Sequence, residues 1–253
     1  MASATVTTGG RPRAARAFST GDRTTRLIAL AGLTSFVLIV AGALIAPPLW
    51  SAPGTHSSAA RAAAYAHEHQ AREIASLFAY TLAMGCFLCF AAGLWSRLRE
   101  IEPAPHPLSA AFALGAVGLV VLVLAAFATG GVLSYRAQGA EVAGVLADTT
   151  FALLALSGMP TAVCLGAYAL LVFRHGSLPR WTAWLALLGA DAHVLITASF
   201  MSHDSFLSLE GSVRIWVPGT FFAWILAASL ALWRARGESG QSISPARASL
   251  GRR

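Results

Sequence analysis

The residue whose type and position most suggest chemistry is Asp191, an acid near the middle of the apolar run 181–201. An ionised carboxylate at the centre of a bilayer costs at least about 2.5–3.5 kcal/mol, so such an acid is expected to be protonated or paired. Two interpretations follow. Asp191 belongs to a site for a proton, a cation or a substrate, or it is a neutral acid that hydrogen-bonds a neighbouring helix.

His193 is the second titratable side chain of this run. At about 3.6 residues per helical turn, Asp191 and His193 are separated by about 200° and point to opposite faces of one helix. If both faces are buried, this helix lies at the centre of a bundle, and that is the arrangement we expect. For an enzyme, the candidate catalytic residues are Asp191, His193, Asp204 and Asp148.

A second group of polar side chains is predicted at the outer membrane surface. His69 and Glu73 are four residues apart, which places two ligands on one helix face, and His203 and Asp204 lie on the same side of the membrane. Such groups could bind zinc or another divalent ion. The chain has no His-Glu-x-x-His motif, so a solvated polar surface is the simpler interpretation, and we expect no metal and no cofactor.

Other motifs give little support for catalysis. Cys86 and Cys89 form a Cys-x-x-Cys pattern, and Cys164 lies in another apolar run. Inside apolar helices cysteine usually behaves as a small hydrophobic residue, so we expect no redox or metal role. The sequence has no Walker-type phosphate loop, no Gly-x-Ser-x-Gly and no Gly-x-Gly-x-x-Gly. This argues against an ATP-driven pump contained within this chain.

The elements that must position these residues are predicted to be transmembrane helices. The chain is 56% apolar and only 11% charged, whereas a soluble domain carries about 25% charged residues. Crossing the hydrocarbon core takes about 20 apolar residues, and backbone groups in lipid must bond internally, which favours helices. Six runs have this length: residues 27–46, 74–95, 110–133, 151–173, 181–201 and 215–233. The predicted fold is therefore an all-α, six-helix membrane bundle.

Arginine placement predicts the orientation of this bundle. The net charge is +7 and the chain contains no Lys. With a cytoplasmic N-terminus, fourteen Arg fall on the inside and four on the outside, so both termini are predicted to be cytoplasmic. The basic charge is attributed to these membrane flanks rather than to nucleic acid binding. Residues 1–24 and 236–253 are predicted to be disordered tails around a domain of residues 25–235.

Two local features are predicted within this layout. The Ala-rich stretch from Ser58 to Glu73 has no Pro or Gly and is expected to form a helix outside the membrane. Pro160 interrupts the fourth run and is expected to kink it, with Ser or Thr side chains bonding the freed carbonyls. Gly115, together with other glycines of the third run, is expected to permit close helix contact.

Three stretches carry a resemblance to a known family. They are RLIALAG at residues 26–32, Arg72 before the second run, and FRHGSLPRW at residues 173–181. With them, residues 24–235 resemble an uncharacterised bacterial, actinobacterial-type family of six-helix integral membrane proteins. The resemblance implies a location in the bacterial inner membrane and supplies no catalytic residues.

The functional expectation is accordingly broad. We expect a non-enzymatic or accessory protein of the cell membrane that transports or senses a small molecule or a proton, with Asp191 as the sensitive group. Its expected partners are the lipid bilayer and either another membrane protein or further copies of this chain. The alternative is a membrane-embedded enzyme that acts on a lipid or isoprenoid through buried acids, which predicts a closed apolar cavity reaching Asp191.

Overall fold

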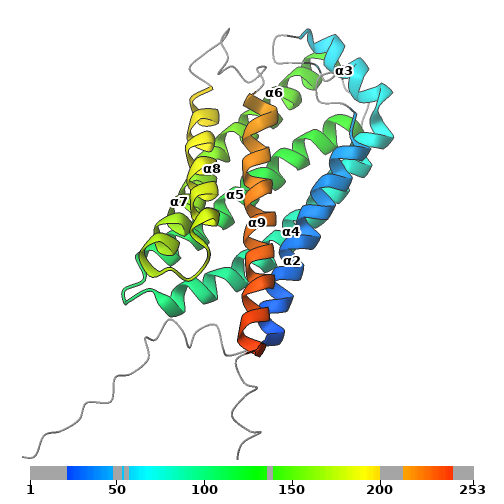
Figure 1. Ribbon diagram of the computed structural model, residues 1–253. Coiled ribbons are helices and arrows are strands. Elements are labelled where there is room, and N and C mark those ends of the chain that lie inside the picture. The colour runs from blue at the N-terminus through cyan, green and yellow to red at the C-terminus, as the bar shows by residue number, and fades with distance from the viewer. Residues whose placement is uncertain (1–21, 48–52, 54–56, 136–138, 200–212, 242–253) are drawn as a thin grey trace, which may run out of the picture.

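The computed structural model describes residues 22–47, 53, 57–135, 139–199 and 213–241, and every regular element in them is a helix (Figure 1). Six helical segments are long and apolar enough to cross a membrane, which confirms the all-α, six-helix prediction. The helices are α2 (Asp22–Ile45), α3 (Ala59–Glu68), α4 (Gln70–Ile101), α5 (Pro107–Tyr135), α6 (Ala140–Leu156), α7 (Gly158–His175), α8 (Arg180–Ala198) and α9 (Val213–Gln241).

Several helices extend beyond the apolar runs that predicted them. α4 has 32 residues, more than the roughly 20 needed to span the hydrocarbon. α2 already begins at Asp22, and α9 continues past residue 235 to Gln241. The α4 extensions consist mainly of good helix formers such as Gln, Arg, Glu and Leu, whereas the α9 extension contains Gly237 and Gly240, so helix propensity explains the first but not the second.

The spanning helices pack around a shared core. α2 packs against α4 and α9, and α5 packs against α4, α6 and α7. Among the described helices, α8 packs mainly against α7 and α9 and makes slight contact with α6. An aromatic cluster from α4, α5, α7 and α9 fills the interior, and rings such as those of Tyr168 and Trp224 lie 5.2 Å apart. Its members are Phe87, Phe90, Phe112, Tyr168, Phe221 and Trp224.

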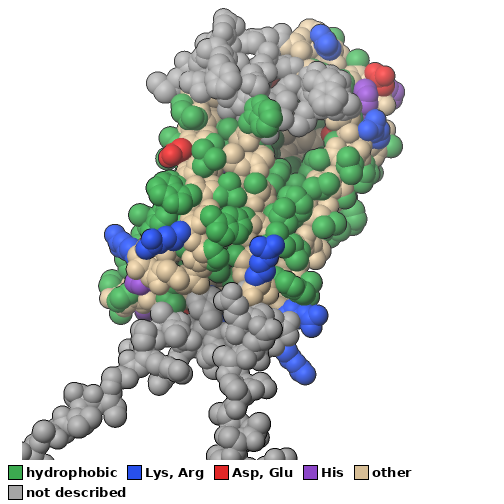
Figure 2. Space-filling model, viewed as in Figure 1, with side chains coloured by type: hydrophobic (Ala, Val, Ile, Leu, Met, Phe, Trp, Pro, Cys, Tyr) green, Lys and Arg blue, Asp and Glu red, His purple; other side chains and the backbone are tan. Residues whose placement is uncertain are grey.

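The start of α2 and the end of α9 lie at the same end of the bundle, opposite α3 (Figure 1). This is the arrangement that an even number of spans requires. On the viewed face, hydrophobic side chains cover the middle of the bundle, and many of the Arg side chains lie toward the lower end (Figure 2). The cytoplasmic assignment of that end stays a prediction.

The predicted helix outside the spans is α3, which begins after Ser58. The Ser58 hydroxyl accepts a hydrogen bond from the backbone N–H of Arg61 at 3.3 Å, as an N-cap does. The helix is interrupted at His69, where α4 begins one residue later instead of α3 continuing to Glu73. Arg72 then fastens α4 to the end of α2 by donating to the carbonyls of residues 45 and 46 at 2.8 and 3.0 Å.

The fourth span is divided into α6 and α7 at Ser157, which confirms the predicted kink near Pro160. The Thr161 hydroxyl donates to the Ser157 carbonyl at 2.7 Å, and this carbonyl also accepts the Thr161 backbone N–H at 3.1 Å. The carbonyl that Pro160 leaves without its helical donor is that of Leu156, so the expected bond from a Ser or Thr side chain to the freed carbonyl is not found among the described residues. Gly158 opens α7 directly against α8, where a Cβ atom would overlap the carbonyl of His193. The kink and this glycine therefore bring the two helices into backbone contact.

Glu102 joins α4 to α5 at the end of the bundle where α2 begins. Its side chain is only 7% exposed, and its carboxylate accepts the backbone N–H groups of Leu108 and Ser109 at 2.9 and 2.8 Å. Burial acts to raise the pKa of this carboxyl, but the two backbone N–H donors, together with the Ser109 hydroxyl and the nearby His106, outweigh it and hold the pKa below its ordinary value. Glu102 therefore caps α5 as a carboxylate.

Candidate functional site

Asp191 lies near the middle of α8, and its side chain is exposed on the outer surface of the bundle. His193 is buried, with 7% of its surface exposed, so the two side chains do occupy different faces of the helix. The expectation that both faces are buried is wrong for the part of the chain that the structure describes, because the His193 face is buried and the Asp191 face is exposed. An acidic side chain stands among hydrophobic and uncharged ones on the face where α8 lies (Figure 2).

His193 is part of the packed interior. Its Nδ1 atom lies 2.7 Å from the carbonyl oxygen of Gly189, and its ring meets Phe221 edge-on with centroids 6.1 Å apart. One turn later, the Thr197 hydroxyl donates to the carbonyl of Ala155 on α6 at 3.3 Å. This face of α8 therefore holds the helix against the kinked fourth span, and it does not form an acid–base pair with Asp191.

The candidates at the α3 end are dispersed in the part of the chain that the structure describes. His69 stacks on Tyr65 with ring centroids 4.4 Å apart, and its Nδ1 lies 3.1 Å from the Tyr65 carbonyl. Asp148 is exposed on α6. His203 and Asp204 lie outside the described residues. Within the described ranges, no three His, Cys, Asp or Glu residues approach closely enough to hold a metal ion.

The three cysteines are free thiols at different exposures. Cys164 is buried in α7, Cys86 is half-buried and Cys89 is exposed, the last two on α4. Cys86 and Cys89 therefore do not form a disulfide here. Their surroundings are those of small hydrophobic residues in a transmembrane bundle.

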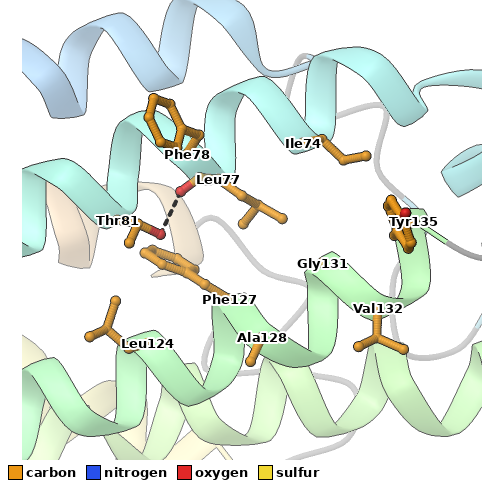
Figure 3. A pocket seen from close by; sticks show the side chains of 10 residues that line it. All are labelled: Ile74, Leu77, Phe78, Thr81, Leu124, Phe127, Ala128, Gly131, Val132 and Tyr135. Carbon is orange, nitrogen blue, oxygen red and sulfur yellow. Dashed lines mark hydrogen bonds between the residues drawn. The ribbon is translucent and has the colours of Figure 1, made fainter.

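A feature that the sequence did not reveal is a pocket between α4 and α5, in the half of the bundle nearer α3. It is a groove that opens on the outside of the bundle, where Phe78, Val132 and Tyr135 are exposed, and its volume is about 510 Å³. That volume is within the range of small-molecule sites. Leu77 and Phe127 project into the space between the two helices, with Ile74 and Tyr135 at one end (Figure 3). The lining residues are Ile74, Leu77, Phe78, Thr81, Leu124, Phe127, Ala128, Gly131, Val132 and Tyr135.

The walls of this pocket offer almost only hydrocarbon. The Thr81 hydroxyl donates to the carbonyl of Leu77 at 2.8 Å, so it is already engaged within its own helix. Gly131 forms part of the α5 wall, and a Cβ atom added there would find its nearest neighbour, Leu77 Cδ1, at 3.9 Å. The sequence had suggested close helix contact at the glycines of α5. That holds at Gly115, but at Gly131 an added Cβ atom would make only an ordinary van der Waals contact.

No protein-family model, curated protein or solved structure matches the chain. The resemblance to a six-helix bacterial family therefore stays a prediction, and function must be argued from the residues of this bundle.

Proposed function

We propose that the protein is a non-enzymatic membrane protein that binds the hydrocarbon part of a lipid or isoprenoid, in a sensing or accessory role. The observation that carries this proposal is the apolar pocket between α4 and α5. It combines a ligand-sized volume with walls that lack acidic, basic and thiol side chains. Such a site favours a long apolar group held by packing.

The position of the pocket supports entry from the bilayer. Both walls belong to membrane-spanning helices, and Phe78 and Val132 are 66% and 47% exposed on the outside of the bundle. An apolar molecule could therefore enter sideways from lipid. Polar groups lie at one end, where the Gln70 side chain donates to the carbonyl of Tyr135 at 3.3 Å. That end suits the head of an amphipathic ligand.

The same geometry favours binding over catalysis. The enzymatic alternative requires acids facing an apolar cavity, but Asp191 and His193 belong to α8, which contributes no residue to this pocket. Asp148 is likewise absent from its walls. The aromatic cluster at the centre of the bundle also leaves little support for a transport route through the described core.

The proposal is tested with photoreactive lipids in liposomes that contain the full-length protein. The probes are palmitate and geranylgeranyl analogues, each carrying a diazirine and an alkyne. We expect labelled peptides from α4 and α5, with unlabelled competitor of the matching class reducing the label. Preference for one probe distinguishes an acyl ligand from an isoprenoid.

Gly131→Leu is the decisive variant, because Gly131 lines the pocket and a Cβ atom there would meet only the Leu77 side chain, at 3.9 Å. Its matched control is Gly166→Leu on α7, where an added Cβ atom meets nothing within 4 Å. We expect Gly131→Leu to remove the α4 and α5 label and Gly166→Leu to retain it. Even labelling of all six spans, unchanged by either substitution, would mean that bulk lipid alone fills the pocket and would refute the proposal.

A further inference from the structure

The outer surface of α8 carries a regular row of large side chains. Trp181, Trp184, Leu188, Asp191 and Leu195 follow one another at spacings of three, four, three and four residues. All five are exposed, and the four hydrophobic ones range from 49% to 63% exposed. This spacing is the one with which two helices pack side by side at a shallow crossing angle. We call these five residues the α8 outer face.

Asp191 gives this face a requirement that lipid cannot meet. The side chain is exposed at the middle of a membrane-spanning helix and has no hydrogen-bond or ion-pair partner among the residues that the structure places. Hydrocarbon offers no hydrogen bond, so even a neutral carboxylic acid is penalised there, and an ionised one is penalised more. The missing partner must come from outside the described part of this protomer.

We propose that the α8 outer face is a dimer interface, and that the partner is a second copy of this chain. Copies inserted with the same orientation are related by a two-fold axis perpendicular to the membrane, so each residue lies at the same depth as its counterpart. Asp191 of one copy therefore meets the partner's Asp191. An unrelated protein would need a polar group at that depth by coincidence, whereas a second copy always supplies one.

The chemistry of the pair is self-complementary. A carboxylic acid has one O–H donor and a carbonyl acceptor, so two acids satisfy each other, or share a single proton, without any other residue. The arginines in the described spans lie toward helix ends, so they provide no counter-charge at the level of Asp191. Packing of Trp184 and Leu188 from both copies would exclude lipid around the pair, and the polar position would fix the register of the two helices.

The interface is tested by cysteine cross-linking in membranes that contain the full-length protein. The background carries Cys86→Ala and Cys89→Ala and retains the buried Cys164. Leu188→Cys, in the α8 outer face, is expected to form a disulfide-linked dimer on mild oxidation. Leu114→Cys, 74% exposed on α5 and at a similar distance along its helix, is the control and is expected to remain monomeric.

The role of Asp191 is tested by its effect on the dimerisation constant, measured by energy transfer between labelled copies at varied protein-to-lipid ratios. Interhelical hydrogen bonds in membranes contribute about 0.6–2 kcal/mol, so Asp191→Leu should weaken dimerisation by about 3- to 30-fold. Asp191→Asn should retain most of it, because two amides also pair with each other. If Asp191→Leu fails to fold, Trp184→Ala still tests the interface, because it should weaken dimerisation by removing packing in the α8 outer face, and an unchanged dimerisation constant in Trp184→Ala would refute that interface.

Each alternative outcome counts against the proposal. A protein that stays monomeric at every lipid ratio, or that cross-links through Leu114→Cys but not Leu188→Cys, has no α8 interface. If Leu188→Cys cross-links to a different protein, the partner of the α8 outer face is that protein and not a second copy of this chain. If the dimerisation constant is unchanged in both Asp191 variants, the proposed pair of carboxylic acids is refuted.

Discussion

The capping of α5 by Glu102 leads to a prediction whose size and pH dependence both follow from the structure. The carboxylate accepts two backbone N–H groups at 2.8 and 2.9 Å at the first turn of α5. Glu102→Ala removes both acceptors, and Glu102→Gln keeps one acceptor but removes the charge. These N–H groups have no acceptor within the helix, so removing the carboxylate leaves them without a partner in the protein and lowers the free energy of unfolding.

The magnitude follows from the two bonds and the charge. Capping side chains contribute about 0.5–2 kcal/mol, and a negative charge at a helix N-terminus contributes typically about 0.3–1 kcal/mol. We therefore expect Glu102→Ala to lower the free energy of unfolding by about 1–3 kcal/mol and Glu102→Gln by about 1 kcal/mol at neutral pH. Glu100→Gln is the control, since this neighbouring acid is exposed and its loss should change stability by less than about 0.5 kcal/mol.

The pH dependence has a definite sign. Because the folded-state pKa of Glu102 lies below the ordinary value of 4.5, its stabilisation is fully present above that pH. It is lost as the pH falls through the lowered folded-state pKa. The difference between wild type and Glu102→Gln should therefore be constant near neutrality and shrink in acid.

The assay is unfolding by sodium dodecyl sulfate in mixed micelles, followed by tryptophan fluorescence and far-ultraviolet circular dichroism across a pH series. Two results would refute the reasoning. One is a Glu102→Ala cost no larger than that of Glu100→Gln. The other is a wild-type advantage over Glu102→Gln that grows on acidification.

Two further predictions concern packing and orientation. Gly115→Ala should destabilise the bundle by roughly 1–3 kcal/mol, because its Cβ atom would lie 2.7 Å from the Cys164 amide nitrogen, whereas Gly166→Ala should be neutral or slightly stabilising in the same unfolding assay. Equal effects of the two would contradict the close α5–α7 contact. Green fluorescent protein fused to either terminus should fluoresce and alkaline phosphatase should be inactive, while the opposite pattern would invert the orientation inferred from Arg placement.

Much of the fold could be predicted because membrane insertion is decided by local composition. Six apolar runs correspond to six spans, Pro160 marks a real interruption, and Ser58 begins the outer helix. The opposite directions of Asp191 and His193 also follow from helix geometry alone, because 100° per residue separates them wherever the helix sits. None of these inferences required knowledge of a neighbouring helix.

The candidate sites were less predictable for a physical reason specific to membranes. Lipid tails are as apolar as leucine, so an apolar helix face carries no signal that separates lipid contact from burial. The sequence could not show that the Asp191 side of α8 faces outward. It also could not show that Gly131 borders a pocket, whereas Gly115 lies at a close contact between α5 and α7.

Sequence alone thus determined how many helices cross the membrane and how side chains are distributed around each one, because both depend on short-range hydrophobicity and periodicity. The tertiary structure decided which faces are covered. It buried His193 beneath α9, opened a pocket between α4 and α5, and left Asp191 on the outside of α8. These outcomes depend on contacts between helices that are distant in the chain. They make the α4–α5 pocket and the α8 outer face the two features on which the functional proposals rest.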